Sequence, residues 1–436
     1  MARTDRHGNT LSGSTGEAIE AFDAAVTAFG RYRGDPVKQL DIALAAAPEC
    51  AAAYLFKAYL FALATEPRAT AFARQLADRA RDLPMNDRER SQLAALDHLI
   101  AGNWTRAAEG LDHHSMLWPR DLVALQSGHL MDFFRANARD LRDRIARALP
   151  AWTEGEPGHS FVLGMHAFGL EECGDYARAE ERGRAAVEGD PLDGWAHHAV
   201  THVLEMQGRT GAGLAWMAER EPFWSGDDSF FQVHNWWHRA LFHLEEEDPA
   251  AALALYDGPV LANTAGTASN LVDGSALLWR VMLSGHEVGD RWIGLAQEWR
   301  KHADGKLFPF NDWHAAMAYL GAGEMDEVDT LLARYDDVPN EVGTWARTTG
   351  RALIEGFRDF ALGSYGDAVA SLAPARQIAN SFGGSHAQRD IIDLTLVEAA
   401  LRADQPDLAR ALSNERLALR PHSPINRAFL TRASAA

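Results

Sequence analysis

The chain has 436 residues, of which 47% are hydrophobic, and a formal net charge of −19 at pH 7. It can bury a large core, but so acidic a balance argues against binding to nucleic-acid phosphates or anionic lipid, because both require a basic surface. Its two cysteines, Cys50 and Cys173, are too few for a disulfide framework or a thiolate zinc cluster, and they fit the reducing cytoplasm.

Residues 1–15 are polar and lack the apolar core of a secretory signal, so they are predicted to form a disordered tail. The longest apolar run, residues 50–64, is shorter than a membrane span and contains Lys57, which favours a buried helix. No membrane association is expected. Across residues 16–436, Ala, Leu, Glu and Arg dominate and β-branched alternation is rare, so the chain is predicted to be nearly all helix.

The predicted helices repeat, most clearly between Leu163 and Pro191. The small, turn, aromatic and stop positions of the tetratricopeptide pattern are occupied there by Ala167, Gly174, Tyr176, Ala179, Ala186 and Pro191. Further copies of the turn occur at Gly102, Gly208, Gly323 and Gly363. Gly174 and Gly208 are 34 residues apart, which is the period of this repeat.

We therefore predict an all-α fold, in which tetratricopeptide-like helical hairpins form one curled α-solenoid over residues 16–436. The repeats are less specific in residues 16–154 than in residues 155–436. Small residues let two helices approach closely, and the next hairpin covers the apolar face that one hairpin leaves open. The inner helices of such a fold line a concave groove that is suited to a small molecule or a peptide.

The first histidine-rich helix is predicted over residues 195–206. Residues separated by four and by seven positions share a helix face, so His198, His202 and Glu205 form one stripe. Two imidazoles and a carboxylate on one face can hold a divalent ion such as zinc, manganese or iron and leave positions open for water or substrate. Alternatively, these are core histidines that hydrogen-bond to a partner such as Asn235 or Asp273.

The second histidine-rich helix, predicted over residues 234–243, carries His234 and His238 four residues apart. The two helices lie about one repeat apart, so their histidines are expected to face each other. Without a metal, four imidazoles with Glu205 and Asp273 would form an acid–base cluster. Aromatic side chains such as Trp195 and Trp237 are candidates for the wall of this pocket.

Two later segments add candidates. Asn311 or Asp312 is expected to cap a helix that places His314 in its first turn, and Ser385 with Gln388 has the spacing of a capping box. Arg389 can clamp a carboxylate or a phosphate, or pair with an acid such as Asp390. We predict that one pocket collects the following side chains: His198, His202, Glu205, His234, His238, Asp273, His314 and Arg389.

The sequence from about Phe161 onward resembles the tetratricopeptide repeat protein 38 family. The segments that carry the resemblance are AFGLEECGDYARAE, WAHHAVTHVLEMQGR, EPFW, HNWWHRALFHLEEEDPAAALALYD, VDGSALLWR, FND with His314, and GGSHAQRD. The resemblance implies a helical-repeat fold and leaves the function undefined. It marks as family motif residues His198, His202, Glu205, His234, Asn235, His238, Asp273, Asn311, Asp312, His314, Gln388, Arg389 and Asp390.

Three classes of function fit these patterns. The first is a binding module that takes a small molecule or a peptide, with Trp195, Asn235, Trp237, Asp312, His314, Gln388 and Arg389 as ligand-binding candidates. The second is an enzyme of the hydrolase or lyase class, with His198, His202, Glu205, His234, His238 and Asp273 as catalytic candidates and the first three also as metal ligands. The third is an assembly scaffold with purely structural histidines. The sequence leaves homo-oligomerisation open.

Overall fold

The computed structural model describes residues 3–263 and 266–435. It divides into two compact units, Met1–Val200 with Pro222–Gln232 and Thr201–Glu221 with Val233–Ala436. The sequence predicts one continuous solenoid over residues 16–436, whereas the contacts within the chain group into these two units. The division passes through α11 (Gly194–Met206) and α12 (Thr210–Trp224), and it separates the first residue of α13 (Gln232–Glu245) from the rest of that helix.

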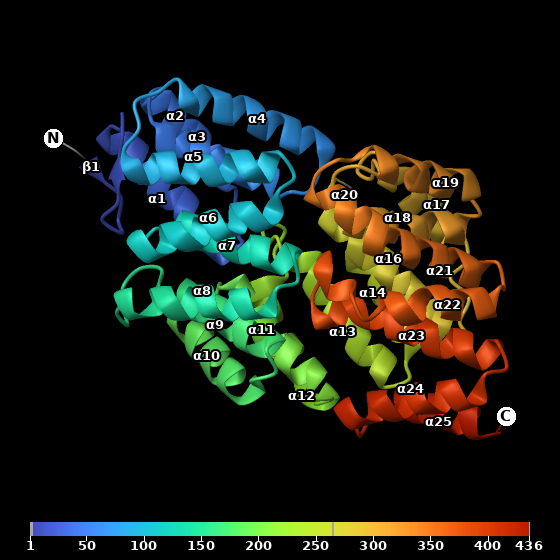
Figure 1. Cartoon of the computed structure of the whole chain (residues 1–436). Helices are drawn as coiled ribbons and strands as arrows, with labels where there is room; N and C mark the ends of the chain where they lie inside the picture. The colour runs from blue at the N-terminus through green and yellow to red at the C-terminus, as the bar shows by residue number, and fades with distance from the viewer. Residues whose placement is uncertain (1–2, 264–265, 436) are drawn as a thin grey trace. The chain divides into compact units, whose positions relative to one another are not determined.

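The first unit is built from helices that follow a short hairpin (Figure 1). Its elements are β1 (Arg3–Thr4), β2 (Thr10–Leu11), α1 (Gly16–Arg31), α2 (Pro36–Ala46), α3 (Ala51–Ala62), α4 (Pro67–Arg81), α5 (Asp87–Ile100), α6 (Trp104–Leu117), α7 (Leu122–Phe134), α8 (Ala138–Ala148), η1 (Leu149–Ala151), α9 (His159–Glu172) and α10 (Tyr176–Gly189). Consecutive helices pack as pairs, among them α1 with α2, α3 with α4 and α9 with α10.

The second unit continues the same arrangement (Figure 1). Its elements are α13 (Gln232–Glu245), α14 (Pro249–Leu255), η2 (Tyr256–Val260), α15 (Leu261–Asn263), α16 (Ala268–Leu283), α17 (Arg291–Trp299), α18 (Pro309–Ala322), α19 (Met325–Arg334), η3 (Tyr335–Asp337), α20 (Glu341–Trp345), η4 (Ala346–Gly350), α21 (Arg351–Ala361), α22 (Tyr365–Ala375), η5 (Ala379–Ser381), α23 (His386–Arg402), α24 (Pro406–Leu419) and α25 (Pro424–Ala435). Helices of successive hairpins also touch, from α16 to α18, α18 to α21, α21 to α23 and α23 to α25. This stacking of one hairpin on the next is how helical hairpins bury a continuous core.

The turn glycines of the repeat pattern are confirmed by their backbone geometry. Gly102, Gly174, Gly208, Gly323 and Gly363 have φ angles of 76°, 79°, 64°, 75° and 80°. Only glycine adopts this left-handed region without steric cost, so each one ends a helix and allows the next helix to turn back. The small residues that follow, such as Ala107 and Ala179, are fully buried where paired helices meet.

The N-terminal segment differs from the predicted disordered tail of residues 1–15. Residues 3–11 form an antiparallel hairpin in which Arg3 pairs with Leu11, and the Leu11 side chain is buried in the core of the first unit. The Asp5 carboxylate organises the turn, because its Oδ1 accepts the backbone N–H groups of His7 and Asn9 at 2.9 and 2.7 Å. Residues 1 and 2 lie outside the described residues.

The apolar run at residues 50–64 forms α3 and is buried, as the sequence predicts. Its single cation, Lys57, is largely buried and forms an ion pair with Asp41 of α2. Within the described residues, no helix combines the length and the apolar character that a membrane crossing requires.

We predict that Gly169→Ala destabilises the first unit. A Cβ atom at Gly169 would lie 2.6 Å from the backbone N and Cα of Arg142, so α8 and α9 would have to separate. Such overpacking costs about 1–3 kcal/mol in the free energy of unfolding, which urea titration measures. The control is Gly366→Ala in α22, where a Cβ meets nothing within 4 Å. We expect it to be neutral or stabilising by about 0.5–1 kcal/mol. Equal stabilities for the two variants would contradict the proposed close approach.

Candidate functional site

Helix α11 begins where Asp193 caps it. The Asp193 Oδ1 accepts the backbone N–H of Ala196 at 2.9 Å, which satisfies a donor that the first helical turn leaves free. Starting from this fixed end, His198 and His202 lie one turn apart on the same face, and Glu205 follows near the C-terminal end of the helix. All three side chains are buried.

Helix α13 supplies the second pair of imidazoles, and each is held by a carboxylate. The His234 Nδ1 lies 2.9 and 3.0 Å from the two carboxylate oxygens of Asp273, which is on α16. The His238 Nδ1 lies 2.7 Å from Oε2 of Glu205. These pairs tie α13 to α11 and to α16. A carboxylate on Nδ1 fixes the ring orientation and leaves Nε2 to meet whatever fills the site.

The Nε2 atoms of His234 and His238 face each other at 3.2 Å. When the Nδ1 of a neutral imidazole donates a proton, its Nε2 carries only a lone pair. Two lone pairs at this separation repel, so the arrangement requires a proton on one ring or a cation between the rings. This requirement is the main chemical property of the site.

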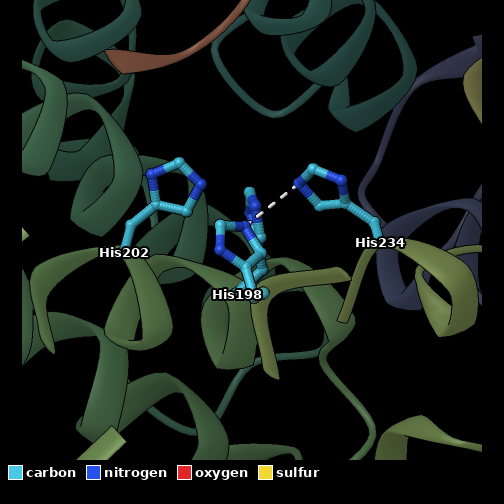
Figure 2. Close-up of side chains that lie close together, drawn as sticks. His198, His202 and His234 are labelled. Atoms are coloured by element: carbon cyan, nitrogen blue, oxygen red, sulfur yellow. Dashed lines mark hydrogen bonds between the residues drawn. The ribbon is translucent and has the colours of Figure 1, made fainter. Parts of the chain in front are cut away.

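The imidazoles of α11 complete a cluster of four, which we call the histidine cluster: His198, His202, His234 and His238. One ring nitrogen from each lies within 4.8 Å of the others. Figure 2 shows His198, His202 and His234 directed toward a common space, with a dashed line that starts at His234. The His202 and His238 rings meet edge to face, with centroids 4.6 Å apart.

Trp237 forms one wall of the cluster. Its ring stacks on His234 with centroids 5.1 Å apart and meets His238 edge to face at 4.7 Å. The guanidinium of Arg280, on α16, lies over the same indole, 5.2 Å from the ring centroid. Trp237 is fully buried, so it fixes the positions of two imidazoles and one cation.

Glu205 connects the histidine cluster to a cavity of about 460 Å³ that it helps to line. Burial raises the pKa of the Glu205 carboxyl, and the charges of Arg420, His202 and Arg280 oppose that shift. The proton between Glu205 and His238 is therefore held in a buried site beside an open space.

Trp195 contacts a cluster histidine, with its ring centroid 5.3 Å from that of His198. It also packs in the core of the first unit, where it stacks on Tyr32 and donates from Nε1 to Nε2 of His129 at 3.1 Å. The Asn235 side chain is fully buried, and among the described residues its amide has no hydrogen-bond partner. It therefore does not serve as the partner of a cluster histidine, a role that Asp273 fills.

The segment at Asn311 differs from the sequence expectation. Helix α18 begins at Pro309 with Phe308 at the cap position, so Asn311 and Asp312 lie inside its first turn rather than at its cap. The Asp312 Oδ1 accepts the backbone N–H of Gly305 at 3.0 Å. The structure does not bring His314 to the histidine cluster. Its Nδ1 donates to the carbonyl oxygen of Phe310 at 2.8 Å, and burial lowers its pKa to about 3.

The segment at Gln388 is explained largely by helix capping. Ser385 and Gln388 form the predicted capping box, in which each side chain accepts the backbone N–H of the other. Arg389 donates to the carbonyl oxygen of Gly384 and lines a different hollow, so the prediction that it joins the cluster is not met. Asp390 pairs with Arg416 at 2.7 and 3.1 Å.

The guanidinium that does approach the cluster is that of Arg280, which sequence analysis missed. The available signal was its place in the segment ALLWRVML, where it is the only charged residue of a strongly apolar helical stretch. A lone charge among buried residues requires a partner or a ligand.

No family model matches the chain. Among solved structures, it aligns over 95% of its length with 76% of a chain titled "Crystal structure of APC/C hetero-tetramer Cut9-Hcn1", at 14% identity and a TM-score of 0.43. It aligns over 98% of its length with 95% of a chain of the human IFIT1 dimer with PPP-AAAA, at 12% identity and a TM-score of 0.42. It aligns over 63% of its length with 98% of a tetratricopeptide repeat protein from Parabacteroides merdae, at 14% identity and a TM-score of 0.35.

The turn glycines and the stacked hairpins described above define the chain as a helical-repeat protein of the tetratricopeptide type.

We predict that Asp312 makes stability depend on pH. Burial, with repulsion from Asp304, raises its pKa from 3.8 to about 8. Between these values the folded protein keeps a proton that the unfolded chain releases. The stabilisation is therefore complete below about pH 4 and is lost as the pH rises toward 8. Relative to Asp312→Asn, the free energy of unfolding of the wild type should fall by roughly 1.4 kcal/mol per pH unit over this window.

Urea titrations at pH 5 and pH 7 measure this difference, and Asp407→Asn at an exposed side chain is the matched control. Parallel stabilities of the wild type and Asp312→Asn at the two pH values would show that Asp312 is ionised in the folded protein.

Proposed function

We propose that this protein binds a small molecule and that its histidine cluster holds a divalent metal ion. The observation that carries the proposal is the 3.2 Å approach of the Nε2 atoms of His234 and His238, whose Nδ1 atoms both meet carboxylates. A cation between the rings would turn a repulsive contact into two coordinate bonds. The same Nδ1 contacts are the carboxylate–histidine–metal arrangement that supports metal ligands in proteins.

The ligand set favours zinc or iron over manganese. Neutral imidazole suits zinc and iron, whereas manganese prefers carboxylate oxygens and water. Sequence analysis grouped His198, His202 and Glu205 as the ligands, but Glu205 is engaged with His238. We therefore propose that the four imidazoles coordinate the metal ion and that Glu205 orients the His238 ring. An ion held by three of them keeps a position for water or substrate.

A second function, catalysis of the hydrolase or lyase class, is favoured by one specific contact. Glu205 shares a proton with His238 and also lines the cavity, so a proton can pass between the cluster and a molecule bound there. A metal ion would add activation of a bound water. Glu205→Gln should then abolish turnover while leaving ligand binding in place.

Membership of the tetratricopeptide repeat protein 38 family is part of this proposal. The family motif residues His198, His202, Glu205, His234, His238 and Asp273 gather in one place, which supports a shared site rather than scattered structural roles. The cysteine content supports the cytoplasm as its location. A small molecule is favoured over a peptide because the cavity beside Glu205 has a volume of about 460 Å³, within the roughly 300–1,000 Å³ of small-molecule sites.

We predict that untagged protein, purified without added metal, contains zinc or iron in near-stoichiometric amount by elemental analysis. His238→Ala should lose the metal, because it removes a central ligand. Asp273→Asn should weaken metal affinity by roughly ten- to a hundredfold, since it removes the support of His234. His243→Ala, on the same helix but outside the cluster, should retain the wild-type metal content.

A wild-type protein that contains no metal, and whose melting temperature is unchanged by added zinc or iron, would rule out the metal centre. In that case the cluster would share protons only. Equal metal content in His238→Ala and His243→Ala would show that any bound metal lies elsewhere.

A further inference from the structure

The cavity beside Glu205 lies entirely within the second unit, between α13, α16, α23, α24 and α25. Its walls are mostly apolar. They include Leu241, Leu244, Leu283, Leu394, Ile425 and Phe429. The guanidinium groups of Arg280, Arg416 and Arg420 line the same space together with the carboxylates of Glu205 and Asp390. Apolar walls with a few convergent charges are typical of a small-molecule site.

Arg280 is the cation of this cavity that has no anionic partner. It is 6% exposed, and it donates to the backbone carbonyl oxygens of Ala276 at 3.3 Å and Ala387 at 2.7 Å. No described carboxylate lies within ion-pair distance of its guanidinium. A guanidinium has five N–H donors, so three of them remain after these two bonds.

Glu245 also lines the cavity, and burial raises the pKa of its carboxyl. The two acids nearest Arg280 are already engaged. Asp390 is bound by Arg416 at 2.7 Å and approached by Arg420 at 3.6 Å, and these contacts, working against its burial, hold its pKa well below the usual range. Glu205 is engaged with His238. Burial lowers the pKa of Arg280 to about 10, with Asp390 and Glu205 opposing the shift, so Arg280 remains charged at neutral pH.

A buried guanidinium without a counter-ion is unfavourable, and an anion delivered by a ligand would compensate it. We propose that the cavity binds a monocarboxylate with an apolar chain, whose carboxylate pairs with Arg280 and whose chain packs on the leucine and phenylalanine walls. This inference names the ligand class of the proposed small-molecule function and rests on that part of it. It does not depend on the metal ion.

The chemistry of the cavity selects this class. The planar guanidinium fork matches the two oxygens of a carboxylate, and the stacking of Arg280 on Trp237 holds that fork in place. A ligand with two negative charges, such as a phosphate monoester, would be repelled by Asp390 and Glu205. A neutral ligand would leave Arg280 uncompensated. A single negative charge on an apolar body fits both constraints.

The test is calorimetric titration of the full-length protein with straight-chain carboxylates from butanoate to decanoate. Octan-1-ol is the neutral match to octanoate. We expect binding that tightens with chain length and is at least tenfold tighter for octanoate than for octan-1-ol. Arg280→Met should weaken octanoate binding by roughly ten- to a hundredfold, the loss expected for a charged hydrogen-bonded pair.

Arg410→Met is the matched control, because Arg410 lies on α24 outside the lining of the cavity, pairs with Asp407 and is half exposed. It should bind octanoate as the wild type does. Arg280→Lys keeps the charge but loses the fork, so its affinity should fall between those of Arg280→Met and the wild type. Melting curves show which variants are folded. If Arg280→Met does not fold, the affinities of the wild type for octanoate and for octan-1-ol decide the test.

Three results would overturn the inference. They are no binding of any carboxylate in the series, equal affinities for octanoate and octan-1-ol, or wild-type octanoate affinity in Arg280→Met. Chelator-treated protein separates this failure from that of the metal proposal. If metal-free protein binds octanoate, the carboxylate site stands whether or not the metal proposal does. If the wild type retains metal, His238→Ala loses it and no carboxylate binds, only the metal centre is supported.

Discussion

Two buried pairs of a carboxylate with an imidazole, Glu205 with His238 and Asp273 with His234, determine how the candidate site is built. Each pair joins two helices that are distant in sequence, and each directs an Nε2 atom at its counterpart. A buried carboxylate without such a partner would be costly, as would a buried imidazole. Within each pair, the two groups offset the cost of burying each other. The same contacts bring the Nε2 lone pairs of His234 and His238 close together.

The helical repeat offsets the free-energy cost of burying these polar groups. Stacked hairpins supply apolar surface on most of their faces, so the second unit retains a core that includes Trp279, Trp299 and Trp313. Against that background, polar residues on α11, α13 and α16 occupy a small part of the interior. The Trp237 indole contacts His234 of the histidine cluster and also Arg280, which lines the cavity.

Much of the fold could be predicted because it follows from local rules. A glycine at each hairpin turn requires a positive φ angle, and the periodic small residues identify the helix faces that meet. The pairing of His198 with His202 and of His234 with His238 follows from helical spacing, and the proximity of the two pairs follows from repeat stacking.

The remaining features depend on tertiary contacts that no local rule contains. Arg389 and Arg280 are both arginines within helices, and only packing decides that Arg280 lies over Trp237 while Arg389 turns to the carbonyl of Gly384. The same is true of the N-terminal hairpin, whose order comes from the Asp5 turn and from burial of Leu11. The division into two units is likewise a property of the contact pattern, which a repeat sequence does not display.

Because Glu205 contacts His238 of the histidine cluster and also lines the cavity, the proposed metal and carboxylate sites would be energetically linked. A molecule in the cavity that changes the proton affinity of Glu205 changes the electron density available at His238, and with it the affinity of the cluster for a cation. Thermodynamic reciprocity requires the converse, so occupation of the cluster alters the affinity of the cavity by the same factor. If both proposed sites are occupied, one side chain would couple them without any movement of the helices.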